Sequence, residues 1–261
     1  MLMVTEEIKS GIERRYAAVA QDLRQELTLA AEMQLHLLPR TSPLKARLDL
    51  AARSIPARAV GGDFYEFIRY GAKRTSAGAI GDATGKGIAA AIYAAMVTGM
   101  VRALAQQEPG AAEMLSALNA MLLGRPVQAR FVSLIYATWD ERARRLQIAN
   151  SGLPHPIHVH NGRITSVEAD GLPLGIFHDA EYQEVSLSCA PGDMVVCFTD
   201  GITDAQDAND QEFGRSRLEE VVALHANGSA QEVVNAIFDA VATHSHGAEA
   251  FDDQSLIVIR T

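Results

Sequence analysis

Four aspartates in this 261-residue sequence stand where apolar, strand-like runs begin or end: Asp63, Asp82, Asp200 and Asp252. The strand ends of a packed sheet lie along one rim, so residues far apart in the sequence can meet there. Converging carboxylates repel one another, and divalent cations relieve that repulsion. Oxygen ligands of this kind suit Mg²⁺ or Mn²⁺. The pattern predicts a metal centre, although a single Asp–Gly pair is also typical of an ordinary turn.

Glycines adjoin three of these aspartates and let the backbone approach a bound ion, so the carbonyl of Ala83 is a further candidate ligand. Gly85-Lys86 resembles the end of a phosphate-binding P-loop. However, Ile80 and Gly87 stand where that motif requires Gly and Ser or Thr. The sequence contains no Gly-x-Ser-x-Gly motif, and Phe198 stands where an aspartyl-phosphate enzyme would place its nucleophile.

Histidines form a rival candidate metal site, because His155, His158 and His160 lie close together in the sequence. His158 and His160 would share one face of a strand. The cluster has no cysteine and no downstream partner at a spacing typical of zinc sites. It is interpreted as surface polarity on a hairpin. Arg58, near the first aspartate, could orient a phosphate or be an ordinary solvated arginine.

The composition is that of a soluble globular enzyme, with 48% hydrophobic and 21% charged residues. The formal net charge of -9 argues against binding to nucleic acid or to an anionic membrane. Cys189 and Cys197 lie in or beside apolar sequence, so we expect buried thiols and a reducing compartment. The first residues lack the apolar core of a signal peptide. A cytoplasmic protein is expected.

The stretch Gly87 to Val101 is the most membrane-like part of the chain. It contains about 15 uncharged residues, whereas a spanning helix needs about 20. We therefore predict a buried helix there.

A long amphipathic helix is predicted over residues 6–38, and Pro39 ends it. Mostly apolar residues recur along it at spacings of three and four and form a stripe on one face of the helix. The residues of this stripe are Ile8, Ile12, Tyr16, Val19, Leu23, Leu27, Ala30, Gln34 and Leu37. No second helical segment adjoins it in the sequence, so a dimeric coiled coil is predicted to cover the stripe. The alternative is that the helix packs along its own domain. Residues 1–40 are accordingly expected to form a linker or dimerisation helix.

Beyond this helix, strands come in runs and helices in pairs, which predicts an α+β domain of mostly antiparallel sheets with helix pairs packed on them. The expected strands are 48–54, 64–70, 76–80, 131–139, 144–149, 156–160, 163–166, 181–187, 193–198 and 254–260. The expected helices are 86–106, 111–123, 214–225 and 230–244. Asn161-Gly162 predicts a tight hairpin between two of the strands.

Six motifs occur in order along the chain. They are Gly61-Gly62-Asp63-Phe64-Tyr65, Gly81-Asp82-Ala83-Thr84-Gly85-Lys86-Gly87, Asn150-Ser151-Gly152, Gly171-Leu172-Pro173-Leu174-Gly175, Thr199-Asp200-Gly201 and Asp252-Asp253. Together they resemble the SpoIIE/RsbU branch of the type 2C, metal-dependent protein phosphatases, over about residues 48–260. The resemblance implies a phosphatase domain over residues 45–261, folded as a four-layer α-β-β-α sandwich.

The resemblance also implies a centre of two Mn²⁺ or Mg²⁺ ions. The matched ligands are the carboxylates of Asp63, Asp82, Asp200 and Asp252 and the carbonyl of Ala83, with Asp253 as a supporting or third-metal residue. Such a pair activates a water molecule that attacks phosphorus without a phosphoenzyme. The expected substrate is phosphoserine or phosphothreonine on a small anti-sigma-factor antagonist.

Two departures from the family pattern concern the substrate side of the site: Glu66 replaces a usual Asp, and Leu153 replaces a common His. No expected metal carboxylate is missing, so an active phosphatase is predicted. Two other functions stay open. One is a catalytically weak dimeric signalling module that acts by binding a partner. The other is a metallohydrolase for small phosphorylated metabolites.

Overall fold

The computed structural model describes residues 2–39, 48–71, 75–127, 130–246, 248 and 250–261, with the side chains of 2–12 and 14 left out. Within these residues, ten strands form two antiparallel five-stranded sheets. Sheet A has the order β1 (Asp49–Ile55), β10 (Gln254–Arg260), β9 (Met194–Phe198), β6 (Ile157–His160) and β7 (Arg163–Ser166). Sheet B has the order β2 (Asp63–Arg69), β3 (Thr75–Ala83), β4 (Val132–Asp140), β5 (Arg145–Asn150) and β8 (Val185–Ser188).

The two sheets face each other, and the alternation of side chains along each strand shows why. In β9 every residue is buried. Val195 and Cys197 contribute to the core between the sheets, whereas Met194, Val196 and Phe198 contribute to the core on the other side of sheet A. A strand that is apolar on both faces must be covered on both faces.

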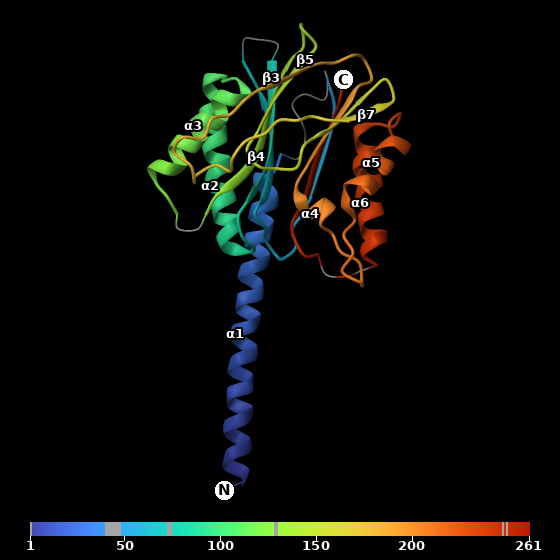
Figure 1. The fold of residues 1–261 in the computed structure, drawn as a ribbon. Helices are drawn as coiled ribbons and strands as arrows, with labels where there is room; N and C mark the ends of the chain where they lie inside the picture. Colours follow the sequence, from blue (N-terminus) through green and yellow to red (C-terminus); the bar gives the residue numbers. More distant parts are fainter. Residues whose placement is uncertain (1, 40–47, 72–74, 128–129, 247, 249) are drawn as a thin grey trace.

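Helices cover the two outer faces, as Figure 1 shows. The helices α2 (Ile88–Leu104) and α3 (Ala111–Gly124) pack on sheet B, and α5 (Gly214–Leu224) and α6 (Ala230–Ser245) pack on sheet A. This arrangement confirms the predicted α-β-β-α sandwich. A short helix that the sequence did not predict, α4 (Asp200–Thr203), follows β9 directly, and a single 3₁₀ turn, η1 (Ala105–Gln107), ends α2.

Most expected elements agree with the structure within two residues, and the Asn161-Gly162 hairpin is confirmed. Both turn residues have positive φ, 50° and 73°, as a two-residue turn of this kind requires. The strand expected over 181–187 is wrong in its first half, because β8 begins only at Val185. Tyr182 instead packs into the core beside α3.

The apolar helix α2 packs against the domain along one side. Ala90, Tyr93, Ala94, Val97 and Val101 are buried there. Together with η1 it is long and apolar enough, by length and composition alone, to cross a membrane. Its buried face agrees with the predicted core helix.

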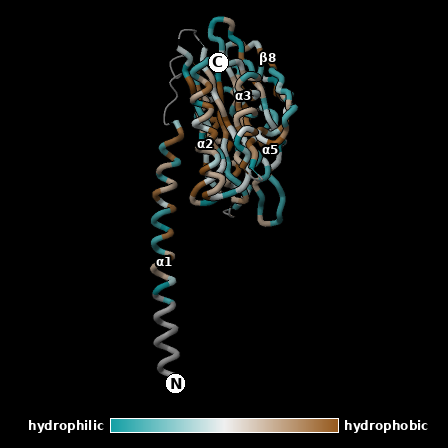
Figure 2. Tube along the Cα trace, turned by 90° about the vertical axis from the view of Figure 1, so that its left-hand side faces the viewer, coloured by the Kyte–Doolittle hydropathy of each residue, from teal (hydrophilic) through white to brown (hydrophobic). Residues whose placement is uncertain are grey.

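The helix α1 (Leu2–Leu37) projects away from the domain, from the end at which α4 lies (Figure 1). At 1.5 Å per residue its 36 residues extend over about 54 Å. Tyr16, Val19 and Leu23 are 73%, 66% and 51% exposed, so this part of the stripe does not pack along its own domain. Figure 2 shows the hydrophobic and hydrophilic positions alternating along the free part of the helix.

Candidate metal centre

Two of the predicted ligands are cross-strand neighbours at the start of β2 and the end of β3. Asp63 lies directly opposite Asp82 in the antiparallel register. The bond from the Ala83 amide to the Gly62 carbonyl, at 3.2 Å, continues the pairing one residue further. A Cβ at Gly62 would lie 2.3 Å from the Ala83 carbonyl oxygen, so only glycine leaves this oxygen undisplaced.

The other two predicted ligands come from the facing sheet. Asp200 lies two residues after β9 ends, as the first residue of α4, and Asp252 lies two residues before β10 begins. Because β9 and β10 are antiparallel neighbours, the end of one adjoins the start of the other. The sequence prediction that strand ends bring these residues to one rim is consistent with this placement.

A hydroxyl connects the two sheets at this rim. The hydroxyl of Thr199 donates from Oγ1 to Oδ2 of Asp63 at 2.8 Å. The same Oγ1 atom of Thr199 accepts a hydrogen bond from the Ser255 amide at 3.0 Å. Thr199 is fully buried and Asp63 is 4% exposed. This role of Thr199 was not predicted from the sequence. The only signal available was its place before Asp200 in the Thr199-Asp200-Gly201 motif.

The carboxylates at the rim disturb one another's ionisation. Burial, followed by repulsion from Asp82, raises the pKa of Asp63 well above its usual range. Burial and repulsion from Asp200 and Asp252 raise the pKa of Asp82 to about 7. Burial is also the main cause of a raised pKa at Asp200. Negative charge from both sheets therefore accumulates around Asp82, which is the condition that bound cations relieve.

Asp253 has a different environment from the other aspartates. It is 3% exposed, and its two carboxylate oxygens accept the amides of Ala57 and Gly62 at 2.7 and 2.6 Å. These bonds fix the loop that precedes Asp63. A Cβ at Gly61 would lie within 2.6 Å of all three atoms of this carboxylate group, so the loop requires glycine there as well.

Cationic side chains lie beside the loop between β3 and α2. The ammonium of Lys86 is 3.1 Å from Oδ2 of Asp252 and also donates to the Phe251 carbonyl. The exposed Arg58 side chain lies next to Gly87, at the start of α2. Arg130 donates to the carbonyl of Thr84 in the same loop. The role of Lys86 was not predicted, since the sequence analysis considered it only as part of a failed P-loop.

The four aspartates are not gathered around a single point. In the part of the chain that the structure describes, His158, His160 and Asp193 are the group of three potential ligands whose atoms lie within 4.8 Å of one another. The ligands of one octahedral Mg²⁺ at 2.0–2.1 Å would be at most about 4.2 Å apart. Among the described residues, no three of the rim carboxylates come as close together as these three side chains do.

The end of α1 is attached to this centre. The side chain of Gln34 donates to the Gly61 carbonyl at 2.6 Å and accepts the Gly61 amide at 3.1 Å. Arg102 on α2 donates both to the carboxylate of Glu66 and to the Leu37 carbonyl at the end of α1. The sequence analysis placed Gln34 in the apolar stripe. A lone amide in such a stripe was the available signal.

The two departures from the family pattern have structural roles. Glu66 is 5% exposed and pairs with Arg102 on the helix side of sheet B. Leu153 is buried between the sheets, and the Asn150 side chain bonds to its backbone amide and carbonyl at 2.9 and 2.8 Å.

Comparison with known proteins agrees with this geometry. The sequence model of the SpoIIE family, described as "Stage II sporulation protein E", matches residues 73–261. The chain belongs to the SpoIIE family. Phosphoserine phosphatase RsbU of Bacillus subtilis is 30% identical over 244 residues, which cover 93% of this chain and 72% of RsbU.

Solved structures share the fold of this SpoIIE-family chain. The SiaA-PP2C domain of Pseudomonas aeruginosa superposes with a TM-score of 0.85 at 21% identity, covering 94% of this chain and 99% of that domain. The catalytic domain of the phosphatase PstP, solved with two manganese ions, has a TM-score of 0.59 at 17% identity, covering 82% and 97%. The predicted family, fold and enzyme class are thus confirmed: the chain is a phosphatase of the SpoIIE family.

Proposed function

We propose that Asp63, Asp82, Asp200 and Asp252, with the Ala83 carbonyl, hold two Mn²⁺ or Mg²⁺ ions that serve hydrolysis of phosphoserine or phosphothreonine in a protein. The observation that carries the proposal is the placement of Asp63 directly opposite Asp82, at the rim where Asp200 and Asp252 lie at adjoining strand ends of the other sheet. Burial and repulsion from Asp200 and Asp252 raise the pKa of Asp82 to about 7. Bound ions would remove that repulsion. The two manganese ions of PstP support the proposed number.

The ions, when bound, lower the pKa of a coordinated water so that hydroxide exists near neutral pH. Thr199 holds Asp63 in place through its hydroxyl. Asp253 holds the loop before Asp63 through two backbone amides, so we assign it a supporting role. Gly62 keeps the Ala83 carbonyl accessible. These residues orient the ligands before any ion arrives, which is the arrangement that catalysis by electrostatic stabilisation requires.

Substrate phosphate would meet the cationic side of the rim. Arg58 is exposed beside Gly87, and its guanidinium can bind two phosphate oxygens at once. Lys86 is held at Asp252 and adds a positive charge next to the proposed ions. Together they would neutralise charge on the transferred phosphoryl group.

The proposed substrate is a small phosphorylated regulator of the anti-sigma-factor antagonist type, acted on in the cytoplasm. The relative RsbU is named a phosphoserine phosphatase, which supports phosphoserine as the residue that is dephosphorylated. The exposed Arg58 side chain beside the rim is accessible to a phosphate displayed on the surface of a protein.

The proposed assembly is a homodimer formed through α1. Tyr16, Val19 and Leu23 are exposed on a helix that leaves the domain, at spacings of three and four. A second copy of the same stripe would cover them in a coiled coil. Because Gln34 near the end of the same helix bonds to Gly61, helix pairing is positioned to influence the metal centre.

Mn²⁺-dependent hydrolysis of an aryl phosphate tests the proposed centre. We expect Asp82→Asn to lower kcat/KM by at least about 100-fold, whereas the matched change Asp179→Asn, at an exposed position, leaves it unchanged. Calorimetry with Mn²⁺ should give two ions per chain, and fewer in Asp82→Asn. Activity that persists in excess chelator would contradict the proposal.

Phosphopeptides then separate the candidate substrates. Peptides that carry phosphoserine or phosphothreonine should be hydrolysed, with phosphorylated sugars and nucleotides hydrolysed far more slowly. The opposite preference would favour a metabolite hydrolase. Ion binding without turnover of any phosphate ester would favour a signalling module that acts by binding.

A further inference from the structure

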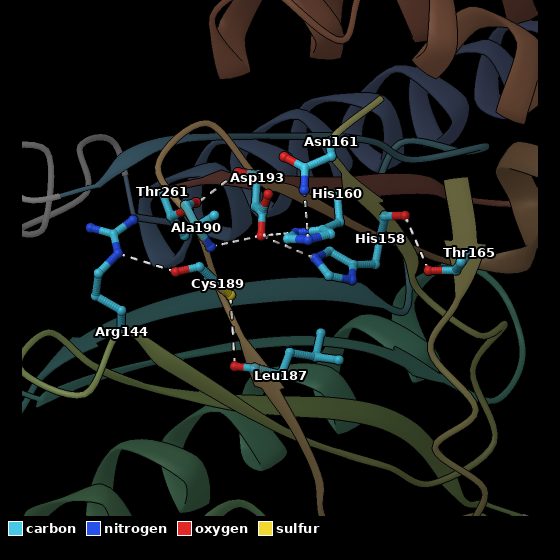
Figure 3. A network of polar contacts seen from close by, with 10 residues as sticks. All are labelled: Arg144, His158, His160, Asn161, Thr165, Leu187, Cys189, Ala190, Asp193 and Thr261. Atoms are coloured by element: carbon cyan, nitrogen blue, oxygen red, sulfur yellow. Dashed lines mark hydrogen bonds and ion pairs between the residues drawn. The ribbon is translucent and has the colours of Figure 1, made fainter. Parts of the chain in front are cut away.

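A compact group of two imidazoles and one carboxylate lies away from the aspartate rim. His158 and His160 are alternate residues of β6, so both side chains stand on the same face of sheet A. Asp193 immediately precedes β9, the strand that pairs with β6. Figure 3 shows both rings directed toward the Asp193 carboxylate.

The distances within the group are those of ligands around one small ion. Nδ1 of His160 is 2.8 Å and Nε2 of His158 is 3.6 Å from the same oxygen, Oδ2 of Asp193. All three ligand atoms lie within 4.8 Å of one another. A tetrahedral ion with bonds of 2.0–2.1 Å separates its ligands by about 3.4 Å. The short contact between His160 and Asp193 would have to lengthen.

The interpretation of these histidines as surface polarity is wrong for His158. This residue is 8% exposed, and its Nε2 is buried without a hydrogen-bond partner. Asp193, at 3% exposed, is already engaged by His160 and by the Ala190 amide at 2.8 Å. A buried ring nitrogen aimed at a carboxylate, but too far away to bond to it, lacks a partner that an ion would supply. His155 is separate, because it bonds to Asp170 at 2.7 Å.

The residues around Asp193 hold its backbone in place, and the group of three side chains is open to solvent on the side of His160. The backbone of Asp193 bonds to Ala190 and to Thr261, so the turn before β9 is fixed on two sides. The His160 side chain is 45% exposed, which gives solvent access to the group. Asn161 lies 3.0 Å from Nε2 of His160. A rotation of its amide would present an oxygen to that nitrogen, the kind of outer partner that orients metal-binding histidines.

We propose that His158 Nε2, His160 Nδ1 and Asp193 Oδ2 form a Zn²⁺-class site, with water in the fourth position. Imidazole and carboxylate ligands suit Zn²⁺ and related transition metals, whereas Mg²⁺ prefers oxygen ligands only. Binding displaces the proton shared by His160 and Asp193 and gives His158 the partner that it lacks.

This site is separate from the proposed catalytic centre. Asp193 and Asp200 flank β9 at opposite ends, and the strand rise of about 3.3 Å per residue puts roughly 20 Å between them. In Figure 1 the C-terminus, whose Thr261 bonds to Asp193, lies at the far end of the domain from α4. An ion there would fasten β6 to the turn before β9 and would stabilise the folded chain without taking part in hydrolysis.

The test is a Zn²⁺ titration of the 261-residue chain in the presence of a chromophoric chelator, with excess Mg²⁺ to occupy the aspartate centre. The parent protein and Asp82→Asn should each bind one tightly held Zn²⁺, and thermal unfolding should shift to higher temperature. His160→Ala, at a half-exposed position, should weaken binding at least tenfold and abolish that shift. Asp193→Asn should weaken it as well.

His155→Ala is the matched control and should bind as the parent does. A cooperative thermal unfolding transition of His160→Ala without Zn²⁺ shows that the variant folds. Co²⁺ in place of Zn²⁺ should give the intense visible bands of a four-coordinate ion. The proposal is overturned if the parent binds no Zn²⁺, if His160→Ala binds as tightly as the parent, or if Asp82→Asn abolishes the binding.

Discussion

The side-chain amide of Gln34 bonds to both backbone groups of Gly61, donating to the carbonyl at 2.6 Å and accepting the amide at 3.1 Å. Gly61 is two residues before Asp63, and Gly62 between them donates to Asp253. The end of a helix that projects from the domain is therefore bonded directly to the loop that precedes Asp63, a proposed metal ligand. Movement of α1 along or about its axis would displace that loop.

Replacing Gln34 by alanine should impair the metal centre without unfolding the domain. Two hydrogen bonds are lost, each contributing about 1 kcal/mol, so we expect roughly a tenfold lower kcat/KM and a higher Mn²⁺ concentration for half-maximal activity. Steady-state assays across Mn²⁺ concentrations measure both. Gln25→Ala, at an exposed position of the same helix, is the control and should change neither. Equal Mn²⁺ dependence in both variants would mean that the attachment is merely structural.

Gly62→Ala should be far more damaging than its size suggests. Its Cβ would lie 2.3 Å from the Ala83 carbonyl oxygen, a proposed ligand, so this oxygen or the loop must move. We expect a loss of at least about 100-fold in Mn²⁺-dependent activity and about 1–3 kcal/mol in the free energy of unfolding. Gly78→Ala in β3 is the control, because its Cβ would meet no atom nearer than 3.7 Å. Full activity of Gly62→Ala would exclude the Ala83 carbonyl as a ligand.

Without divalent cations, the protein should become less stable as the pH rises from 4 to 7. The pKa of Asp82 is raised to about 7 in the folded chain, against 3.8 for the free side chain. The folded state therefore holds a proton that the unfolded state has released, and stability falls over this window by at most about 4 kcal/mol. Thermal unfolding in chelator across this pH range measures the effect.

Asp82→Asn cannot ionise at this position and should flatten the pH profile of the metal-free protein. Mn²⁺ should reverse the trend in the parent, because the ions bind only the ionised carboxylates. A metal-free parent that is more stable at pH 7 than at pH 5 would show that the carboxylates do not repel one another as the structure indicates.

Leu23→Glu should separate the proposed dimer into monomers. The side chain of Leu23 is 51% exposed on the projecting part of α1, and a charge at a coiled-coil core position opposes pairing. Light scattering coupled to gel filtration gives the mass of parent and variant directly. Gln25→Glu adds the same charge two residues away and should leave the dimer intact. A parent that is monomeric at micromolar concentration would refute the dimer.

The layers of the fold were predictable because each rests on local pattern. Strand β9 is apolar at consecutive positions and had to be buried on both faces, while the glycine turn at Asn161-Gly162 fixed the β6–β7 hairpin. The boundary of β8 was not predictable, since Tyr182 looks like a strand residue in sequence but packs into the core beside a helix. Tertiary packing decided its conformation.

The aspartates could be selected from sequence because each stands at a strand end, and the motifs supplied their order. The residues that bond to the rim from elsewhere in the chain could not be selected in this way. Thr199 meets Asp63 across 136 positions and Gln34 meets Gly61 across 27, and neither pairing follows from periodicity. The same holds for Asp193, which joins the two histidines only because β6 and β9 are adjacent in sheet A.

The hydrogen bonds of the Thr199 hydroxyl affect how the domain unfolds. It bonds to Asp63 of sheet B while accepting the Ser255 amide of sheet A, and together with the bond from the Gly62 amide to Asp253 it fastens the two halves of the sandwich at the rim. Any partly unfolded form in which the halves slide or separate at the rim must break these bonds. Such a form would lose its affinity for ions while its helices and strands were still intact, and ion release would be the earliest sign of denaturation.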